Sequence, residues 1–257
     1  MLGFRILGPV EIHTPAKDVR PRGSLQLTLL VALLVNARTM VPAEELIGEL
    51  WNDAHPSRVE NALQAHVSRL RQRLAALEPQ AGSSRLITYP SGYRLMVDDE
   101  ELDAAVFARG VERIRARAPD DDPPATALEL RRILALWRGP VFGGLVAGDM
   151  CRSAAVRYEE MRLAALELLF DSELRNGGHM RIIPELRELL IEDSYKERFQ
   201  QQLMVALYRA GRQTDALDAY RDLWRRLTEE LGIEPSPTMR AYEQAILDQD
   251  PALDQAP

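Results

Sequence analysis

The chain has 257 residues, 46% apolar and 28% charged, which is typical of a folded protein of one or two domains and excludes a disordered chain. Its single cysteine, Cys151, excludes an internal disulfide or a cysteine-based metal site, and its four histidines are too far apart to form a metal-ligand motif. The apolar run at residues 25–35 is too short to span a bilayer and resembles no signal peptide, so we expect a cytoplasmic protein without membrane partners.

The net charge of −7 is unevenly distributed along the chain. Residues 1–98 carry eleven Lys and Arg against nine Asp and Glu, whereas residues 99–257 carry 21 against 30. Within residues 57–95, six arginines stand against two glutamates, a balance of +4. A basic segment in an otherwise acidic chain indicates a contact with nucleic acid in that segment.

The first elements along the chain are short strands and two helices. Residues 2–12 alternate in polarity and are rich in β-formers, which predicts one or two short hairpins. Ser24 is placed to cap a first helix that runs to about residue 36. Pro42 fits the first turn of a second helix, which ends before the short polar loop 52–56.

A third helix is predicted over residues 57–77, where Ser57-Arg58-Val59-Glu60 matches a capping box. Apolar side chains recur along it at intervals of three and four, at Leu63, Val67, Leu70, Leu74 and Leu77. The pattern of residues 85–97 then predicts a hairpin that turns at Pro90-Ser91-Gly92. Strands, three helices and a hairpin in this order are the layout of a winged helix-turn-helix.

The face of the third helix opposite its apolar stripe carries the candidate DNA contacts. Asn and Gln can pair with adenine and Arg with guanine, so the candidates for reading base edges are Asn61, Gln64, Ser68, Arg69 and Gln72. The candidates for phosphate or wing contacts are the arginines on the flanks and in the hairpin, Arg58, Arg71, Arg73 and Arg94. Taken alone, the same residues also fit an ordinary amphipathic helix with a solvated arginine face.

The second half of the chain is almost entirely helical. The acidic, proline-rich stretch 119–124 separates it from a helix over about 103–117. Gly177 and Gly211 are 34 residues apart, and apolar positions on both sides keep this spacing, which is typical of tetratricopeptide repeats. The predicted fold class is therefore mainly α with small β-hairpins, an N-terminal winged helix-turn-helix followed by an all-α tetratricopeptide-like domain. The expected parts are 1–98 for DNA binding, 99–124 for a connecting helix and linker, 125–250 for the repeats and 251–257 for a tail.

Several stretches carry a resemblance to a known family. They are RILGPVEI, ELIGELW, ENALQAHVSRLRQRL, TYPSGYRL, LALWRGPVF and the long segment LMVALYRAGRQTDALDAYRDLWRRLTEELGIEPSPTMRAYEQAIL. In this order they resemble the Streptomyces antibiotic regulatory protein family. Its members pair an OmpR-type winged helix with a bacterial transcriptional activator domain. The resemblance covers nearly the whole chain.

The resemblance implies an activator of a secondary-metabolite gene cluster, associated with the nucleoid. Such a protein would bind direct repeats in double-stranded promoter DNA, as a homodimer or as side-by-side protomers, and recruit RNA polymerase holoenzyme. The loop after the second helix is then a candidate polymerase contact through Asn52, Asp53 and His55. The helical repeats could in addition hold a peptide or a small effector.

The sequence offers no chemistry for catalysis. No nucleophile, base and orienting group recur together, and there is neither a metal or cofactor motif nor a phosphate-binding loop, so we expect no enzyme, no catalytic residue and no cofactor. The alternative function is a non-catalytic tetratricopeptide scaffold whose basic domain tethers DNA without sequence preference. A footprint on a defined repeat would separate the two.

Overall fold

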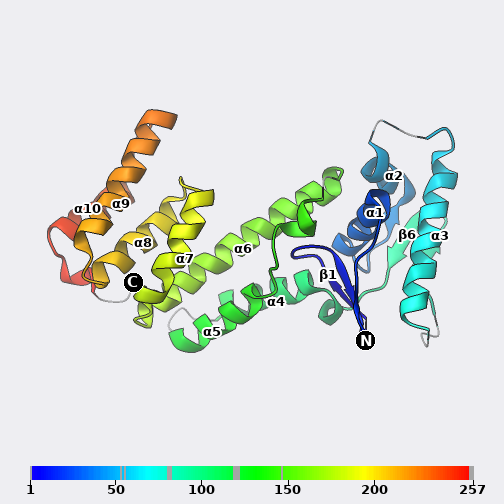
Figure 1. The fold of residues 1–257 in the computed structure, drawn as a ribbon, viewed down its shortest axis with the longest axis horizontal. Helices are drawn as coiled ribbons and strands as arrows, with labels where there is room; N and C mark the ends of the chain where they lie inside the picture. The colour runs from blue at the N-terminus through cyan, green and yellow to red at the C-terminus, as the bar shows by residue number, and fades with distance from the viewer. Residues whose placement is uncertain are drawn as a thin grey trace. The chain divides into compact units, whose positions relative to one another are not determined.

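The computed structural model describes residues 2–52, 54, 56–79, 83–117, 122–145 and 147–254 (Figure 1). These residues form a mainly helical fold with two small antiparallel sheets, as the sequence predicts. Met1–Arg115 and Arg132–Leu163 make one compact unit, and Ala116–Arg131 with Ala164–Pro257 make a second. The fold class is therefore confirmed.

The first unit opens with a three-stranded antiparallel sheet formed by β1 (Gly3–Arg5), β2 (Glu11–His13) and β3 (Asp18–Val19). Phe4 lies opposite Ile12 in the register, and both side chains are buried. Because successive side chains of a strand point to opposite faces, this pairing places one apolar face of the sheet on the core.

Three helices and a second sheet follow. They are α1 (Ser24–Val35), α2 (Ala43–Trp51) and α3 (Val59–Leu77), and β4 (Val41–Pro42), β5 (Leu86–Tyr89) and β6 (Gly92–Leu95), with β6 in the centre of the sheet. The three helices pack on one another. Every residue from Leu29 to Leu34 is buried, so α1 is the central helix of the winged helix.

Two predictions about helix starts are wrong. Ser24 lies inside α1, whose N-cap is Gly23, and no side chain caps this helix. Pro42 ends β4 opposite Gly92 and is the N-cap of α2, so it precedes the first turn that was predicted for it. The ψ of Pro42 is 144°, which is typical of an extended strand. Because Pro42 also pairs with β6, it belongs to the strand and not to the helix.

The first unit continues beyond residue 98, where the sequence pattern places the end of the first domain. It includes η1 (Asp99–Glu101), α4 (Asp103–Arg115), the end of α5 (Pro123–Leu134), η2 (Val141–Gly144) and the first part of α6 (Asp149–Arg175). Asp103 accepts hydrogen bonds from the backbone amides of Ile6 at 2.8 Å and Leu7 at 3.1 Å. Arg138 donates to the buried carboxylate of Glu11 at 2.8 Å. The N-terminal strands are thus fastened to segments that lie beyond residue 98.

A buried glutamate of α2 binds the start of α6. Glu49 is 5% exposed, and its carboxylate accepts hydrogen bonds from the amides of Met150 at 2.9 Å and Cys151 at 3.0 Å. An acid at a helix N-terminus satisfies free amides and suits the positive end of the helix dipole. A Cβ at Gly148 would approach the Oε2 atom of Glu49 to 2.6 Å, so the contact also requires a glycine there.

The second unit contains the repeats, with α7 (His179–Glu192), α8 (Glu197–Arg209), α9 (Gln213–Arg226), α10 (Pro237–Leu247) and η4 (Pro251–Leu253) after the rest of α6. Helix α8 packs on both α7 and α9. Gly177 and Gly211 have φ values of 74° and 71° and form corresponding turns, as the period of 34 residues predicts. Within the residues that the structure describes, no helix is both long and apolar enough to cross a membrane.

Candidate nucleic-acid interface

Helix α3 separates an apolar face from a polar one, as its sequence pattern predicts. Leu63, Val67, Leu70 and Leu74 are all at most 4% exposed, whereas Leu77 at the end of the helix is half-buried. The proposed base readers Asn61, Gln64, Ser68, Arg69 and Gln72 are all exposed. None of these five side chains has a hydrogen bond or ion pair to another of the described residues. The outer face therefore presents five polar side chains whose hydrogen-bonding groups are available to a ligand.

The start of α3 differs from its prediction. The helix begins at Val59 with Arg58 as N-cap, and no side chain caps it, so the capping box at residues 57–60 is wrong. The match depended on Ser57 being the residue before the helix, and the chain instead makes a turn at residues 57 and 58. Arg58 is exposed at this end, where it remains a candidate for a phosphate contact.

The wing is the hairpin of β5 and β6, in which Tyr89 lies opposite Gly92 beside the turn. The guanidinium of Arg94 stacks over the Tyr89 ring at 4.5 Å from its centroid. Its Nε atom is buried and has no hydrogen-bond partner in the part of the chain that the structure describes. The stacking holds the cation beside Tyr89, near the turn of the hairpin.

Two of the candidate phosphate arginines contact neighbouring elements. Arg71 is half-buried and donates through Nε to the carbonyl of Leu86 at 3.2 Å and through Nη2 to the hydroxyl of Thr88 at 2.7 Å. Arg71 therefore fastens β5 of the wing to α3. Arg73 is exposed and reaches the carbonyl of Arg22 at 3.4 Å, a long bond that leaves most of its donors available.

His66, which belongs to no sequence motif, connects α3 to α1 and α2. Nε2 of the buried Gln26 lies 2.8 Å from Nδ1 of His66 and donates to the His66 carbonyl at 3.1 Å. The ring of Trp51 meets the His66 ring edge-on, with centroids 5.9 Å apart. Burial, with a smaller effect of Arg69, lowers the pKa of His66, so this histidine is neutral at physiological pH. No sequence motif marks these three residues, because they come from three helices.

A second group that sequence reasoning missed connects the wing with the end of α3. Arg85 is bound to the carboxylates of Glu78, at 2.5 and 2.8 Å, and of Glu101, at 2.6 and 2.7 Å. The hydrogen bond from Arg85 holds the pKa of Glu78 below its ordinary value. For Glu101, burial acts in the opposite direction, but hydrogen bonds from Arg85 and the Asp98 amide still lower the pKa. Both acids are therefore ionised at neutral pH.

The candidate polymerase loop follows α2. Asn52 is exposed and has a φ of 46° with a ψ of −125°, a positive-φ conformation that is uncommon for residues other than glycine. Its amide closes the helix by bonding to the Gly48 carbonyl at 2.9 Å. Asp53 and His55, the other two candidates, lie outside the described residues.

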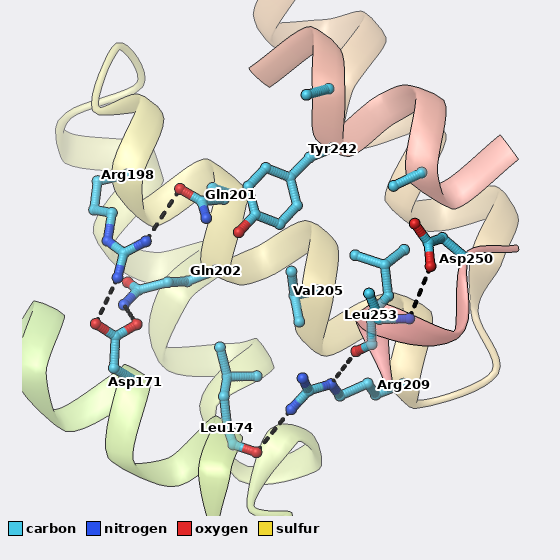
Figure 2. Close-up of a pocket in the computed structure, with 13 residues that line it drawn as sticks. Asp171, Leu174, Arg198, Gln201, Gln202, Val205, Arg209, Tyr242, Asp250 and Leu253 are labelled. Carbon is cyan, nitrogen blue, oxygen red and sulfur yellow. Dashed lines mark hydrogen bonds and ion pairs between the residues drawn. The ribbon is translucent and has the colours of Figure 1, made fainter. Parts of the chain in front are cut away.

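The second unit contains a cavity of about 280 Å³ bordered by α6, α8, α10 and η4 (Figure 2). Arg198 pairs with Asp171 at 2.5 Å, and Gln202 donates to the same carboxylate at 2.7 Å. Arg209 donates to the carbonyls of Leu174 at 2.8 Å and Leu253 at 2.6 Å. Both lining arginines thus make contacts within the protein, and no sequence motif marks the residues of this cavity.

Among the residues that the structure describes, no group of three or more His, Cys, Asp or Glu side chains could hold a metal ion.

Two family models match this chain, one after the other. Residues 22–95 match the family described as "Transcriptional regulatory protein, C terminal", and residues 102–247 match "Bacterial transcriptional activator domain". Transcriptional regulator RedD of Streptomyces coelicolor is 40% identical over 252 residues, which are 97% of this chain and 71% of that protein. Regulatory protein DnrI of Streptomyces peucetius is 32% identical over 98% of this chain and 94% of its own length.

A solved structure has the same architecture. EmbR of Mycobacterium tuberculosis, determined in complex with a low affinity phosphopeptide, superposes with a TM-score of 0.85 at 31% identity. The match covers 97% of this chain and 66% of the EmbR chain, so the present chain spans about two thirds of that protein. Over nearly its whole length, this chain shares with these regulators an OmpR-type winged helix joined to a bacterial transcriptional activator domain. This chain is therefore a member of the Streptomyces antibiotic regulatory protein family of DNA-binding transcriptional regulators.

Proposed function

We propose that this protein activates transcription of a secondary-metabolite gene cluster by binding direct repeats upstream of its promoters. The observation that carries the proposal is the outer face of α3. Its five exposed polar side chains have no partners among the described residues, while the opposite face is packed into the core. A helix with one buried apolar face and one exposed polar face is suited to the major groove, where base edges offer hydrogen-bond donors and acceptors.

In this proposal the residues on α3 and on the wing have different roles in DNA binding. Gln64 and Ser68, one turn apart, read base edges, and Arg58 and Arg73 contact phosphates. Arg94 enters the adjacent minor groove from the tip of the wing. Arg71, whose donors hold Leu86 and Thr88, sets the position of the wing relative to α3.

The remaining partners are proposed on the family resemblance. RNA polymerase holoenzyme would meet the loop that follows α2, which begins at the exposed Asn52. Two protomers would lie side by side on the DNA. The cavity of the second unit would be the place for a peptide or a small effector of the helical domain.

The proposal is tested by replacing one base reader. Gln64→Ala should weaken binding to the cognate repeat by about 1 to 3 kcal/mol and binding to unrelated duplex only slightly, because the lost hydrogen bonds are to base edges. Genomic fragments that the protein retains would be sequenced to find the repeat. Binding would then be measured by fluorescence anisotropy at two salt concentrations.

Arg58→Ala is the contrasting variant. It should weaken binding to both duplexes to the same degree and lower the salt slope by about one unit, since it removes one phosphate contact. If Gln64→Ala leaves the ratio of cognate to random affinity unchanged, the outer face of α3 does not read bases. Equal protection of random DNA by the unaltered protein would favour the tethering scaffold.

The arrangement on a direct repeat has its own test. Protomers that bind head to tail on one face of the duplex should have half-sites about 10 to 11 base pairs apart. Insertion of about 5 base pairs rotates one half-site to the opposite face, so it should abolish joint binding, and a full turn should restore part of it. Electrophoretic mobility shifts on the three duplexes measure this, and indifference to spacing would mean that protomers bind independently.

A further inference from the structure

The first unit contains a second cavity, of about 330 Å³, against the inner side of α3. Apolar side chains from β2, β3 and α3 line it, namely Ile12, Val19, Leu70 and Leu77. Its volume lies at the lower end of the range for small-molecule sites, about 300 to 1,000 Å³. Its apolar lining suits a hydrocarbon chain or ring and not a sugar or a nucleotide.

Three arginines lie at the same cavity, Arg20, Arg22 and Arg73, and no acidic residue lines it. Arg20 is neutralised by Glu11, to which it donates at 3.0 and 2.8 Å. Arg73 reaches only a backbone carbonyl, and the exposed side chain of Arg22 has neither a hydrogen bond nor an ion pair within the described part of the chain. Two guanidinium groups beside an apolar cavity therefore remain without a counter-charge.

We propose that this cavity binds a small organic acid with an apolar body. The body would fill the space between Val19 and Leu70, and the carboxylate would meet Arg22 and Arg73. A planar guanidinium binds a carboxylate through two parallel hydrogen bonds, which fixes the direction in which the acid enters. The backbone of a DNA duplex is charged and polar throughout and cannot occupy the apolar part of the site. The ligand would touch α3 at Leu70, Leu77 and Arg73, and it would share Arg73 with the DNA phosphate that the proposed function assigns to that arginine.

The probe is decanoate, titrated calorimetrically into the full chain without DNA, so that the result does not depend on the proposed function. We expect saturable binding of one decanoate per chain. Decanol, which has the same chain without the charge, and acetate, which has the charge without the chain, should each bind at least about tenfold more weakly. Arg22→Gln should weaken decanoate binding by about tenfold, since it removes a charge-assisted hydrogen bond.

Two pairs of variants locate the site. Ala76→Phe places a ring in the cavity and should abolish binding, whereas Ala75→Phe, one residue earlier on α3 and not in this cavity, should leave it unchanged. Arg132→Gln, at an exposed arginine that does not line the cavity, is the control for Arg22→Gln. Circular dichroism melts confirm that each variant is folded. Absence of binding to the unaltered chain, equal binding of acetate, or equal loss in a variant and its control would each overturn the proposal.

Discussion

Replacement of Arg85 by alanine is expected to lower the free energy of unfolding by about 3 kcal/mol at neutral pH. The side chain of Arg85 is 19% exposed and bridges Glu78 and Glu101, of which Glu101 is only 5% exposed. Without the guanidinium, two ionised carboxylates would face each other in a partly buried site. One uncompensated buried charge is already costly, and a second of the same sign adds repulsion.

The same replacement should change the pH dependence of stability. Both glutamates have a folded-state pKa below the ordinary value of 4.5. A lowered pKa means that the stabilisation is present above pH 4.5 and is lost as the pH falls through the folded-state values. The unaltered protein should thus lose stability on acidification below about pH 4.5. Arg85→Ala should lose less over this interval, because protonation relieves the repulsion between its carboxylates.

Urea unfolding at pH 7 and at several lower pH values measures both effects. Arg132→Ala, at an exposed arginine, is the matched control and should change stability little. Arg85→Lys should recover only part of the loss, since an ammonium cannot bond both carboxylates in the geometry of a guanidinium. Equal stability of Arg85→Ala and Arg132→Ala at pH 7 would show that the cluster contributes nothing.

Gly92→Ala is the second substitution with a large expected effect. A Cβ at this position would lie 2.1 Å from the carbonyl oxygen of Val41 and 2.8 Å from the sulfur of Met40. Backbone cannot yield as a flexible side chain does, so β4 and β6 would have to separate. We expect a loss of about 3 kcal/mol in the free energy of unfolding, at the upper end of the cost of overpacking.

The control is the same substitution at Gly48 in the middle of α2. Apart from its two chain neighbours and the nearby backbone of its own helix, a Cβ there would meet no atom within 4 Å, so Gly48→Ala should stabilise the helix by about 0.5 to 1 kcal/mol. Thermal melts of the two variants should therefore shift in opposite directions. Because Gly92 pairs with Tyr89 beside the wing turn, Gly92→Ala should also weaken DNA binding. A melt unchanged by Gly92→Ala would mean that the two strands can separate at no cost.

The amino-acid sequence is sufficient to predict the elements whose residues follow a regular spacing. The spacing of Leu63, Val67, Leu70 and Leu74 predicts which face of α3 is buried, because a helix returns to the same face every three to four residues. The exposed outer face follows from the same period. The repeat of 34 residues likewise predicts the glycine turns at Gly177 and Gly211. In each case a regular spacing along the chain carries the pattern.

The contacts that the charged and capping residues make depend on tertiary packing. Ser24 and Ser57 have the residue type of a helix cap but do not act as one, because cap geometry depends on how the chain enters the helix. Arg71, a phosphate candidate by its place on the helix, is engaged by β5. Glu49 has the appearance of a surface residue of α2, yet it is buried at the start of α6, about a hundred residues further on. The periodicity of apolar residues predicts which face of a helix is buried. The partner of a polar side chain depends instead on which distant segment of the chain packs against it. The spacing of residues within one element does not reveal that segment.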